Sequence, residues 1–250
     1  MMKFKNEKKL VNIFLIVIIL ISICFNILTF KTNYEVNKIK TNKNIVMLTF
    51  DDGPGKEDEQ IMDILKDYNA KATFFGTGIN YEKYWTDAVI NKLVKRMILE
   101  GHSLGNHSYY HIKYNYNLNK AYKEFYKTSQ MIVEIYRDND IEMNISNIPV
   151  RMPFLQYYRG LNSLQNKLNI NYFVRGYLGC DYNEAVCGKK KILKQYTNNI
   201  RKGQILVCHT RNYATQWLPD LLQYLENKSY KTANFTLGDY YFGNYGRLIF

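Results

Sequence analysis

The chain has 250 residues, of which 46% are hydrophobic, and carries a formal net charge of +12. This length suffices for one domain with a large core. The positive charge does not indicate a nucleic-acid partner, because Lys and Arg form no block with interleaved aromatic residues. The excess of Lys suits an anionic wall or surface polymer, but lysines that are only solvated explain it better.

The chain begins with an apolar run, Leu10–Phe30, that contains no charged residue and has lysines on both sides. A helix needs about 20 mostly apolar residues to span a bilayer. We therefore expect a tail and a single transmembrane helix over 1–30, a polar stalk over 31–43 and an extracytoplasmic domain over 44–250. The open alternatives are a cleaved signal peptide, which would make the protein secreted, and a lipoprotein signal, but no small-x-small cleavage site follows the run.

Strand and helix patterns alternate along the domain. Short apolar runs bounded by turn residues predict strands at 44–50, 71–76, 102–107, 148–154, 171–176, 204–209 and 230–235. Apolar residues at helical spacing predict helices at 57–68, 86–99, 119–137, 161–168, 189–202 and 215–227. This alternation indicates an α/β fold with parallel strands, and a small barrel accommodates so many units better than an open sheet. In such a barrel the chemistry lies at the C-terminal ends of the strands.

Reactive side chains follow the predicted strands at these ends. They are Asp51, Asp52, His107, His111, Arg151, Asp181 and His209. The H-x3-H spacing of His107 and His111 would place both imidazoles on one face of a helical turn, where they can share a cation. Zinc binds His nitrogens and carboxylate oxygens, and two His with one Asp leave a position for water. The spacing alone also fits ordinary surface or core histidines, and the Asp pair at a strand end favours a metal.

The stretch "TFDDGP" places two carboxylates, Asp51 and Asp52, side by side. One carboxylate can bind a metal while the other acts as general base toward the attacking water, and the cation then offsets the repulsion between them. Taken alone, the same stretch is a good turn sequence. The reactive residues at the other strand ends favour the catalytic interpretation.

Five stretches in order, "TFDDGP", "GHSLGNHSYYH", "RMPF", "CDY" and "ILVCH", resemble the motifs of the polysaccharide deacetylases, carbohydrate esterase family 4 with its NodB-homology domain. The resemblance covers roughly residues 44–235. It implies a distorted (β/α)7 barrel. It also implies hydrolysis of the N-acetyl group of N-acetylglucosamine-type residues in a cell-wall or surface polysaccharide, with release of acetate. The implied cofactor is a divalent metal, with Zn²⁺ favoured and Co²⁺, Ni²⁺ or Fe²⁺ also compatible with such ligands.

The resemblance assigns roles to the residues of the first three motifs. It implies that Asp51 is the catalytic base and that Asp52, His107 and His111 bind the metal. Arg151 would pair with the base and hold it ionised. These roles agree with the chemistry, because an acetamide must be attacked by a poised hydroxide near a cation.

The later motifs supply the implied acid and the oxyanion donor. His209 would be the general acid that protonates the leaving amine, and Asp181 would orient it and raise its pKa. The backbone N–H of Phe154, which follows the motif proline, would stabilise the oxyanion. The chain departs from the family pattern where Tyr182 replaces Trp, where Thr210 replaces Asp and where "PFLQYY" lacks a glycine, so the substrate groove is expected to differ.

Other residues and functions stay open at this point. His102 fits a structural role better than a ligand role. Cys180 and Cys187 form either a disulfide, which suits an exported domain, or free thiols, because C-x6-C is not a zinc spacing. The alternatives to a deacetylase are an amidase of the same fold acting on a non-sugar C–N bond and a glycan-binding pseudoenzyme. The sequence does not identify the polysaccharide or the oligomeric state.

Overall fold

The computed structural model describes residues 16–17, 35–235 and 247–249. The chain divides into two units, Met1–Asn33 and Tyr34–Phe250. The expected transmembrane helix, Leu10–Phe30, lies outside the described residues except for Ile16 and Val17. Within the described part of the chain, no helix has the length and apolar character that a membrane span requires.

The second unit is built around strand β3 (Ile45–Asp51), all of whose residues are buried. It pairs in parallel with β8 (Gln204–His209) and with β4 (Ala72–Gly76), and β4 pairs in parallel with β5 (Ser103–Asn106). A parallel strand covered on both faces favours a continuous apolar run, as β3 has. The expected α/β fold with parallel strands is therefore confirmed for this central part of the sheet.

The register of the central strands brings reactive residues together. Asp51, the last residue of β3, lies opposite His209 of β8 on one side and opposite Phe75 of β4 on the other. His107 directly follows the end of β5. The carboxyl ends of these strands therefore meet at one edge of the sheet, as the sequence predicted.

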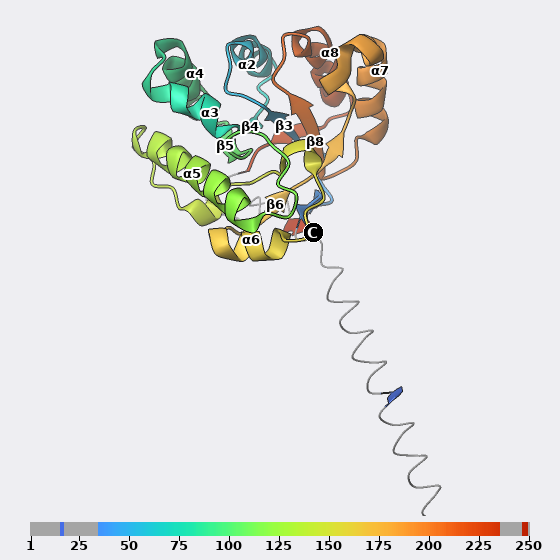
Figure 1. Cartoon of the computed structure of the whole chain (residues 1–250). Helices are drawn as coiled ribbons and strands as arrows, with labels where there is room; N and C mark the ends of the chain where they lie inside the picture. Colours follow the sequence, from blue (N-terminus) through green and yellow to red (C-terminus); the bar gives the residue numbers. More distant parts are fainter. Residues whose placement is uncertain (1–15, 18–34, 236–246, 250) are drawn as a thin grey trace, which may run out of the picture. The chain divides into compact units, whose positions relative to one another are not determined.

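Helices surround the strands of this unit (Figure 1). Their bounds are α2 Glu57–Asp67, α3 Gly78–Tyr81, α4 Ala88–Leu99, α5 Leu118–Arg137, α6 Leu161–Leu168, α7 Glu184–Asn199 and α8 Ala214–Asn227. Each of the six predicted helices has a counterpart here, because its apolar stripe packs toward the sheet. In α8, for example, Trp217, Leu218 and Leu221 are almost fully buried.

The helix expected at 189–202 begins earlier than the sequence indicated. A first turn starts at Glu184 and is separated from the rest of α7 by Gly188, which has a φ of 60°. A disulfide between Cys180 and Cys187 closes this first turn. The sequence left disulfide and free thiols open, and the structure has the disulfide.

The strand predicted at 148–154 is wrong in extent. Val150 forms isolated parallel bridges to Asn106 of β5 and to Phe173 of β6 (Phe173–Val174). A 3-10 turn then begins at Pro153, which has no backbone N–H to donate to a ladder. The next predicted strand, 171–176, is reduced to the two residues of β6, and a further short strand, β7 (Tyr177–Leu178), begins just beyond it and pairs with β8. The sheet is thus curled, and the expected seven-stranded barrel is met in part.

The prediction of a polar stalk over 31–43 is wrong for the residues of this range that the structure describes. β1 (Glu35–Val36) pairs with β6, and β2 (Lys38–Lys40) pairs with β8 and with β10 (Arg247–Ile249). Val36 and Ile39 are buried in a small apolar cluster with Ile45. Two apolar side chains among lysines are enough to hold an edge segment, and the charged neighbours of Ile39 stay exposed.

The last predicted strand, 230–235, is shorter in the structure. β9 (Lys231–Ala233) pairs in parallel with the first half of β3. Phe235 follows it and is almost fully buried.

Candidate metal and acid–base site

The turn after β3 separates the two adjacent carboxylates. Asp52 has a φ of 79°, in the left-handed region that Asp tolerates better than most residues. The Asn80 side chain donates a hydrogen bond to the Asp52 carbonyl at 2.8 Å, and Thr77 N–H donates to the Gly53 carbonyl at 2.8 Å. Asp51 is almost fully buried, whereas the Asp52 side chain is 32% exposed. The two carboxylates therefore have different environments although they are neighbours in sequence.

Asp52, His107 and His111 form a cluster that can hold a metal ion. One ligand atom from each lies within 4.8 Å of the others. Asp52 Oδ1 lies 3.8 Å from His107 Nε2 and 3.4 Å from His111 Nε2. Two imidazole nitrogens and one carboxylate oxygen are a donor set that suits Zn²⁺ and other late first-row divalent metals.

The loop after β5 brings the two imidazoles together without the helical turn expected from their spacing. Ser108 and His111 both have positive φ, 66° and 53°. The Asn106 side chain accepts a hydrogen bond from Ser108 N–H, and Ser108 Oγ accepts one from His111 N–H. The imidazole rings of His107 and His111 lie 4.8 Å apart between centroids. Side-chain hydrogen bonds thus determine the conformation of this loop, and the H-x3-H spacing does not reveal them.

His107 is buried and held in the tautomer that a metal requires. Its Nδ1 lies 3.0 Å from the Arg151 carbonyl oxygen, so Nδ1–H donates and Nε2 keeps its lone pair. Burial lowers the pKa of His107, although Asp51 and Asp52 act in the opposite direction. A neutral imidazole with Nε2 directed at Asp52 is what ligation needs.

Asp51 forms a buried ion pair with Arg151. Arg151 Nη1 donates to Asp51 Oδ1 at 2.6 Å, and the Arg151 side chain is fully buried. The guanidinium also donates to Thr49 Oγ1 and to the Arg175 carbonyl, and it lies over the Phe75 ring. Burial raises the pKa of the Asp51 carboxyl, but the charge and hydrogen bond of Arg151, together with the charge of His209, outweigh burial and leave the pKa lowered.

His209 is hydrogen-bonded twice to Asp181. The carboxylate accepts from the His209 backbone N–H at 2.7 Å and lies 3.1 Å from Nδ1, which donates to it. Burial lowers the pKa of His209, but the hydrogen bond and charge of Asp181 outweigh burial, so the pKa is raised. This imidazole can therefore hold a proton near neutral pH with Nε2 directed elsewhere.

These groups line one cavity of about 360 Å³. Its walls are Asp51, Asp52, His107, His111, Phe154, Leu155, Leu178, Tyr182, Val207, His209 and Arg211. Arg151 and Asp181 lie behind this wall and contact Asp51 and His209. All the residues assigned to the site from the sequence therefore lie in or directly behind one cavity. Their catalytic roles stay a prediction.

Phe154 borders the metal cluster. Its ring centroid lies 4.4 Å from that of His111, and the residue is 55% exposed. Both Phe154 and Leu155 have positive φ, 60° and 47°. Non-glycine residues in the left-handed region are uncommon and cluster at functional sites. The sequence placed Phe154 here only through the resemblance, because nothing local indicates this conformation.

Arg211 is a cavity residue that sequence reasoning missed. It lies two residues beyond His209, and its Nη2 is 3.9 Å from Asp52 Oδ2. Its place just after the end of β8 was a usable signal, because polar residues that follow a parallel strand face the same edge. Tyr182, noted from the sequence only as a departure from the family pattern, also lines the cavity, 6.1 Å from His209 between ring centroids.

The departure at Thr210 has a structural counterpart. Thr210 Oγ1 donates to Asp58 Oδ1 at 2.7 Å, and Asp58 Oδ2 accepts from Gly55 N–H at 2.9 Å. Burial raises the pKa of Asp58 to about 7. Asp58 thereby connects the turn that carries Asp52 to the loop that follows His209.

His102 has the structural role that the sequence favoured. Its Nδ1 accepts a hydrogen bond from Ala72 N–H at 3.1 Å, and its ring packs edge-on against Phe74. Burial lowers its pKa to about 4. The neutral ring connects β4 to the residue before β5.

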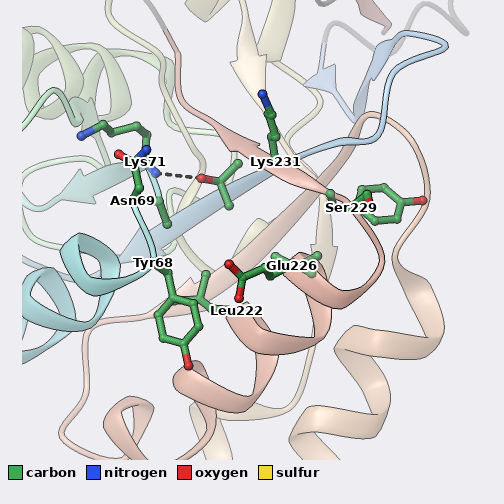
Figure 2. A pocket seen from close by; sticks show the side chains of 11 residues that line it. Tyr68, Asn69, Lys71, Leu222, Glu226, Ser229 and Lys231 are labelled. Atoms are coloured by element: carbon green, nitrogen blue, oxygen red, sulfur yellow. Dashed lines mark hydrogen bonds between the residues drawn. The ribbon is translucent and has the colours of Figure 1, made fainter.

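A second cavity, of about 630 Å³, lies among residues at the ends of α2 and α8 and the starts of β4 and β9. Figure 2 shows Tyr68, Lys71, Glu226 and Lys231 around it, with the Lys71 backbone N–H donating to Thr232 at 2.8 Å. Glu226 is the one carboxylate among its lining residues, which include no His or Cys. This larger cavity therefore has no acid–base or metal-binding set, and the smaller one is the candidate active site.

The sheet carries a candidate metal-ligand cluster and two hydrogen-bonded acid–base pairs at the carboxyl ends of its strands, and this combination defines the class of α/β protein. A family model described as polysaccharide deacetylase matches residues 38–173. The chain belongs to the polysaccharide deacetylase family, whose enzymes use a divalent metal.

Curated relatives are similar over parts of the chain. A peptidoglycan-N-acetylglucosamine deacetylase of Bacillus cereus is 51% identical over 71 residues, which are 28% of this chain and 24% of that protein. The peptidoglycan-N-acetylmuramic acid deacetylase PdaC of Bacillus subtilis (strain 168) is 29% identical over 176 residues, 68% of this chain and 33% of that protein. The chain thus spans a quarter to a third of the length of these relatives.

A solved structure has the same fold. The Xyl-CE4 domain of a multidomain xylanase from the hindgut metagenome of Trinervitermes trinervoides superposes with a TM-score of 0.64 at 26% identity. The match covers 77% of this chain and 88% of that domain.

Proposed function

We propose that this protein is a metal-dependent deacetylase that removes the N-acetyl group from amino sugars of a cell-wall polysaccharide. The observation that carries the proposal is the arrangement within one cavity. The ligand set Asp52, His107 and His111 adjoins a separate carboxylate, Asp51, and an Asp-paired imidazole, His209. The two relatives from Bacillus cereus and Bacillus subtilis are peptidoglycan deacetylases, which supports peptidoglycan as the substrate class.

The residues present fit a divalent metal. Nε2 of His107, Nε2 of His111 and Oδ1 of Asp52 converge, and the hydrogen bond at His107 Nδ1 fixes the required tautomer. We infer that these three residues hold the ion, with Zn²⁺ first among candidates. Bound there, it would lower the pKa of the attacking water and polarise the acetamide carbonyl.

Asp51 acts as the general base in this proposal. Its Oδ2 lies 3.6 Å from His107 Nε2, next to the ligand cluster, while Oδ1 is held by Arg151. The Arg151 charge keeps the carboxylate ionised and fixes its orientation. Asp51 takes a proton from water as the water oxygen bonds to the acetamide carbon, and the Phe154 backbone N–H donates to the oxygen that becomes negative.

His209 completes the reaction as the general acid. Asp181 holds Nδ1–H, so the protonated ring presents Nε2–H to the nitrogen of the tetrahedral intermediate. Transfer of this proton lets the C–N bond break, and acetate and the free amine leave. Asp51 then returns the proton taken from water to the solvent, and His209 regains its own.

We also propose that residues 44–250, together with the strands of residues 35–40, work outside the cytoplasm. Leu10–Phe30 would serve as a single-pass anchor, or the domain would be secreted after cleavage. The disulfide between Cys180 and Cys187 supports export, because disulfides persist in oxidising compartments.

The proposal is tested with the purified full chain in detergent on a panel of N-acetylated glycans: peptidoglycan, chito-oligosaccharides and poly-N-acetylglucosamine. Acetate release is measured before and after treatment with a chelator and after addition of Zn²⁺ or Co²⁺. We expect release that the chelator abolishes and the metal restores. Absence of acetate from every glycan in the metal-loaded protein would refute the proposal, and release from non-sugar acetamides alone would favour the amidase.

A further inference from the structure

Arg211 places a cation at the edge of the candidate metal site. It follows β8 and lines the same cavity as Asp52 and His209. Its side chain is 45% exposed, so the guanidinium is accessible from solvent. Across the residues that the structure describes, the Arg211 guanidinium pairs with one charged group, the Asp52 carboxylate, and donates no hydrogen bond.

The two oxygens of Asp52 face different groups. Oδ1 faces Nε2 of both histidines, and Oδ2 lies 3.9 Å from Arg211 Nη2. This separation is too long for a hydrogen bond. Arg151, by contrast, holds Asp51 at 2.6 Å. Arg211 therefore does not hold Asp52 by a hydrogen bond. The planar fork of N–H groups on its guanidinium can bind another carboxylate in a bidentate manner.

The charge around the cavity favours an anionic substituent on the substrate. Arg151 already neutralises Asp51, and a divalent ion would outweigh the charge of Asp52. Arg211 then adds a positive charge on one side, and Lys113 lies 5.6 Å above the Phe154 ring beside His111. Although Asp51 and Asp52 line the cavity, the balance of charge around it would be positive with the ion bound, and such a balance attracts anionic ligands.

Resting on the proposed function, we propose that Arg211 determines specificity by binding a carboxylate on the sugar that is deacetylated. The substrate class is an acetamido sugar with an acidic substituent on the ring carbon next to the acetamide, as in the lactyl ether of N-acetylmuramic acid. Adjacent ring carbons place the two substituents side by side. A sugar with its acetamide at the metal cluster therefore carries the carboxylate toward the neighbouring guanidinium. A neutral N-acetylglucosamine residue has no group for this contact.

The test compares three soluble substrates with the metal-loaded full chain. They are a peptide-free fragment of alternating N-acetylglucosamine and N-acetylmuramic acid, the same fragment with its carboxylates converted to methyl esters, and a chito-oligosaccharide of equal length. The readout is the ratio of kcat/KM for the acid to kcat/KM for the ester, from acetate release. Because the ratio is taken within one variant, a general loss of activity does not change it.

We expect the wild-type protein to prefer the acid over the ester by about 10- to 100-fold, the range for a charge-assisted hydrogen bond. Arg211→Gln should reduce the ratio to near one, with the change mainly in KM, and Arg211→Lys should keep part of it. Arg137→Gln, which removes the same charge from the exposed end of α5, is the matched control and should keep the wild-type ratio.

Co²⁺ affinity, followed by its absorption spectrum, provides a readout independent of turnover. If Arg211→Gln lowered kcat/KM equally for the acid and the ester and also weakened Co²⁺ binding, the proposal would be overturned, and the role of Arg211 would be to hold Asp52. A wild-type ratio near one would overturn it as well. If the wild-type protein released acetate from none of the three substrates, the proposed function itself would fail, which is a separate result.

Discussion

Arg151 and Asp51 form an ion pair at 2.6 Å in which the arginine side chain is fully buried and the aspartate side chain is 3% exposed. They lie 100 positions apart in the chain, and the pairing depends on Val150 bridging β5 and β6 beside the central strands. A buried pair is weak evidence of stability in itself, but removal of one partner leaves an uncompensated buried charge.

Arg151→Met is therefore expected to lower the free energy of unfolding by about 3–5 kcal/mol, because the Asp51 charge would lose its counter-ion. Urea denaturation followed by circular dichroism measures this loss. The double variant Arg151→Met with Asp51→Asn should regain part of the stability, since the unpaired charge is then absent. A single variant within about 1 kcal/mol of wild type would show that Asp51 is stabilised by other groups.

Asp181→Asn is expected to change the pH dependence of turnover. Asp181 raises the pKa of His209 against burial, so His209 stays protonated to higher pH in the wild-type protein. Without this charge the pKa of His209 falls, and the alkaline limb of the kcat/KM profile should move to lower pH. An alkaline limb at the wild-type position would argue against His209 as the general acid.

His111→Ala should weaken Co²⁺ binding by more than about 100-fold, because loss of a ligand costs more than the 10- to 100-fold typical of outer-shell changes. Titration of the metal-free protein, followed by absorption, measures the affinity. His102→Gln also removes an imidazole but one that accepts from Ala72 N–H, so it is the matched control. Equal weakening in both variants would contradict the assigned ligand set.

His102 also gives a prediction for stability against pH. Its pKa is about 4 in the folded protein, below the ordinary value of 6.5, so the unfolded chain binds more protons between these values. The stabilising contribution of the neutral His102 ring is therefore present above pH 6.5 and is lost as the pH falls toward 4. When the pH is lowered from about 7 to about 5, the free energy of unfolding of the wild-type protein should fall by about 2 kcal/mol more than that of His102→Gln, whose side chain does not titrate. If the free energy of unfolding changed equally with pH in the two proteins, this prediction would be contradicted.

The sequence predicted the elements that depend on local patterns. The apolar run of β3 and the stripe of α8 are found with bounds within one residue of those expected. The rule that chemistry lies at the carboxyl ends of parallel strands correctly brought Asp51 and His209 together, and the register places them opposite each other.

Features that depend on non-local contacts were not predictable in this way. Val150 forms isolated bridges instead of a strand. Val36 and Ile39 join the sheet because their segments pair with strands that lie far away in the sequence. The positive φ of His111 follows from side-chain hydrogen bonds in its loop, and no periodic pattern encodes it. The proximity of Arg211 to Asp52 is also a non-local contact, although the position of Arg211 just after β8 was a signal that sequence reasoning did not use.

The central claim is that Asp51 is the base and Asp52 a ligand, although they are neighbours in the sequence. The most direct measurement is acetate release by Asp51→Asn and wild type, both loaded with Co²⁺ and with the metal content of each determined. We predict equal metal content and a kcat lower by about 10²- to 10⁴-fold in the variant, the range for loss of general base catalysis. A variant that kept wild-type turnover, or that lost its metal, would contradict the division of roles between the two carboxylates.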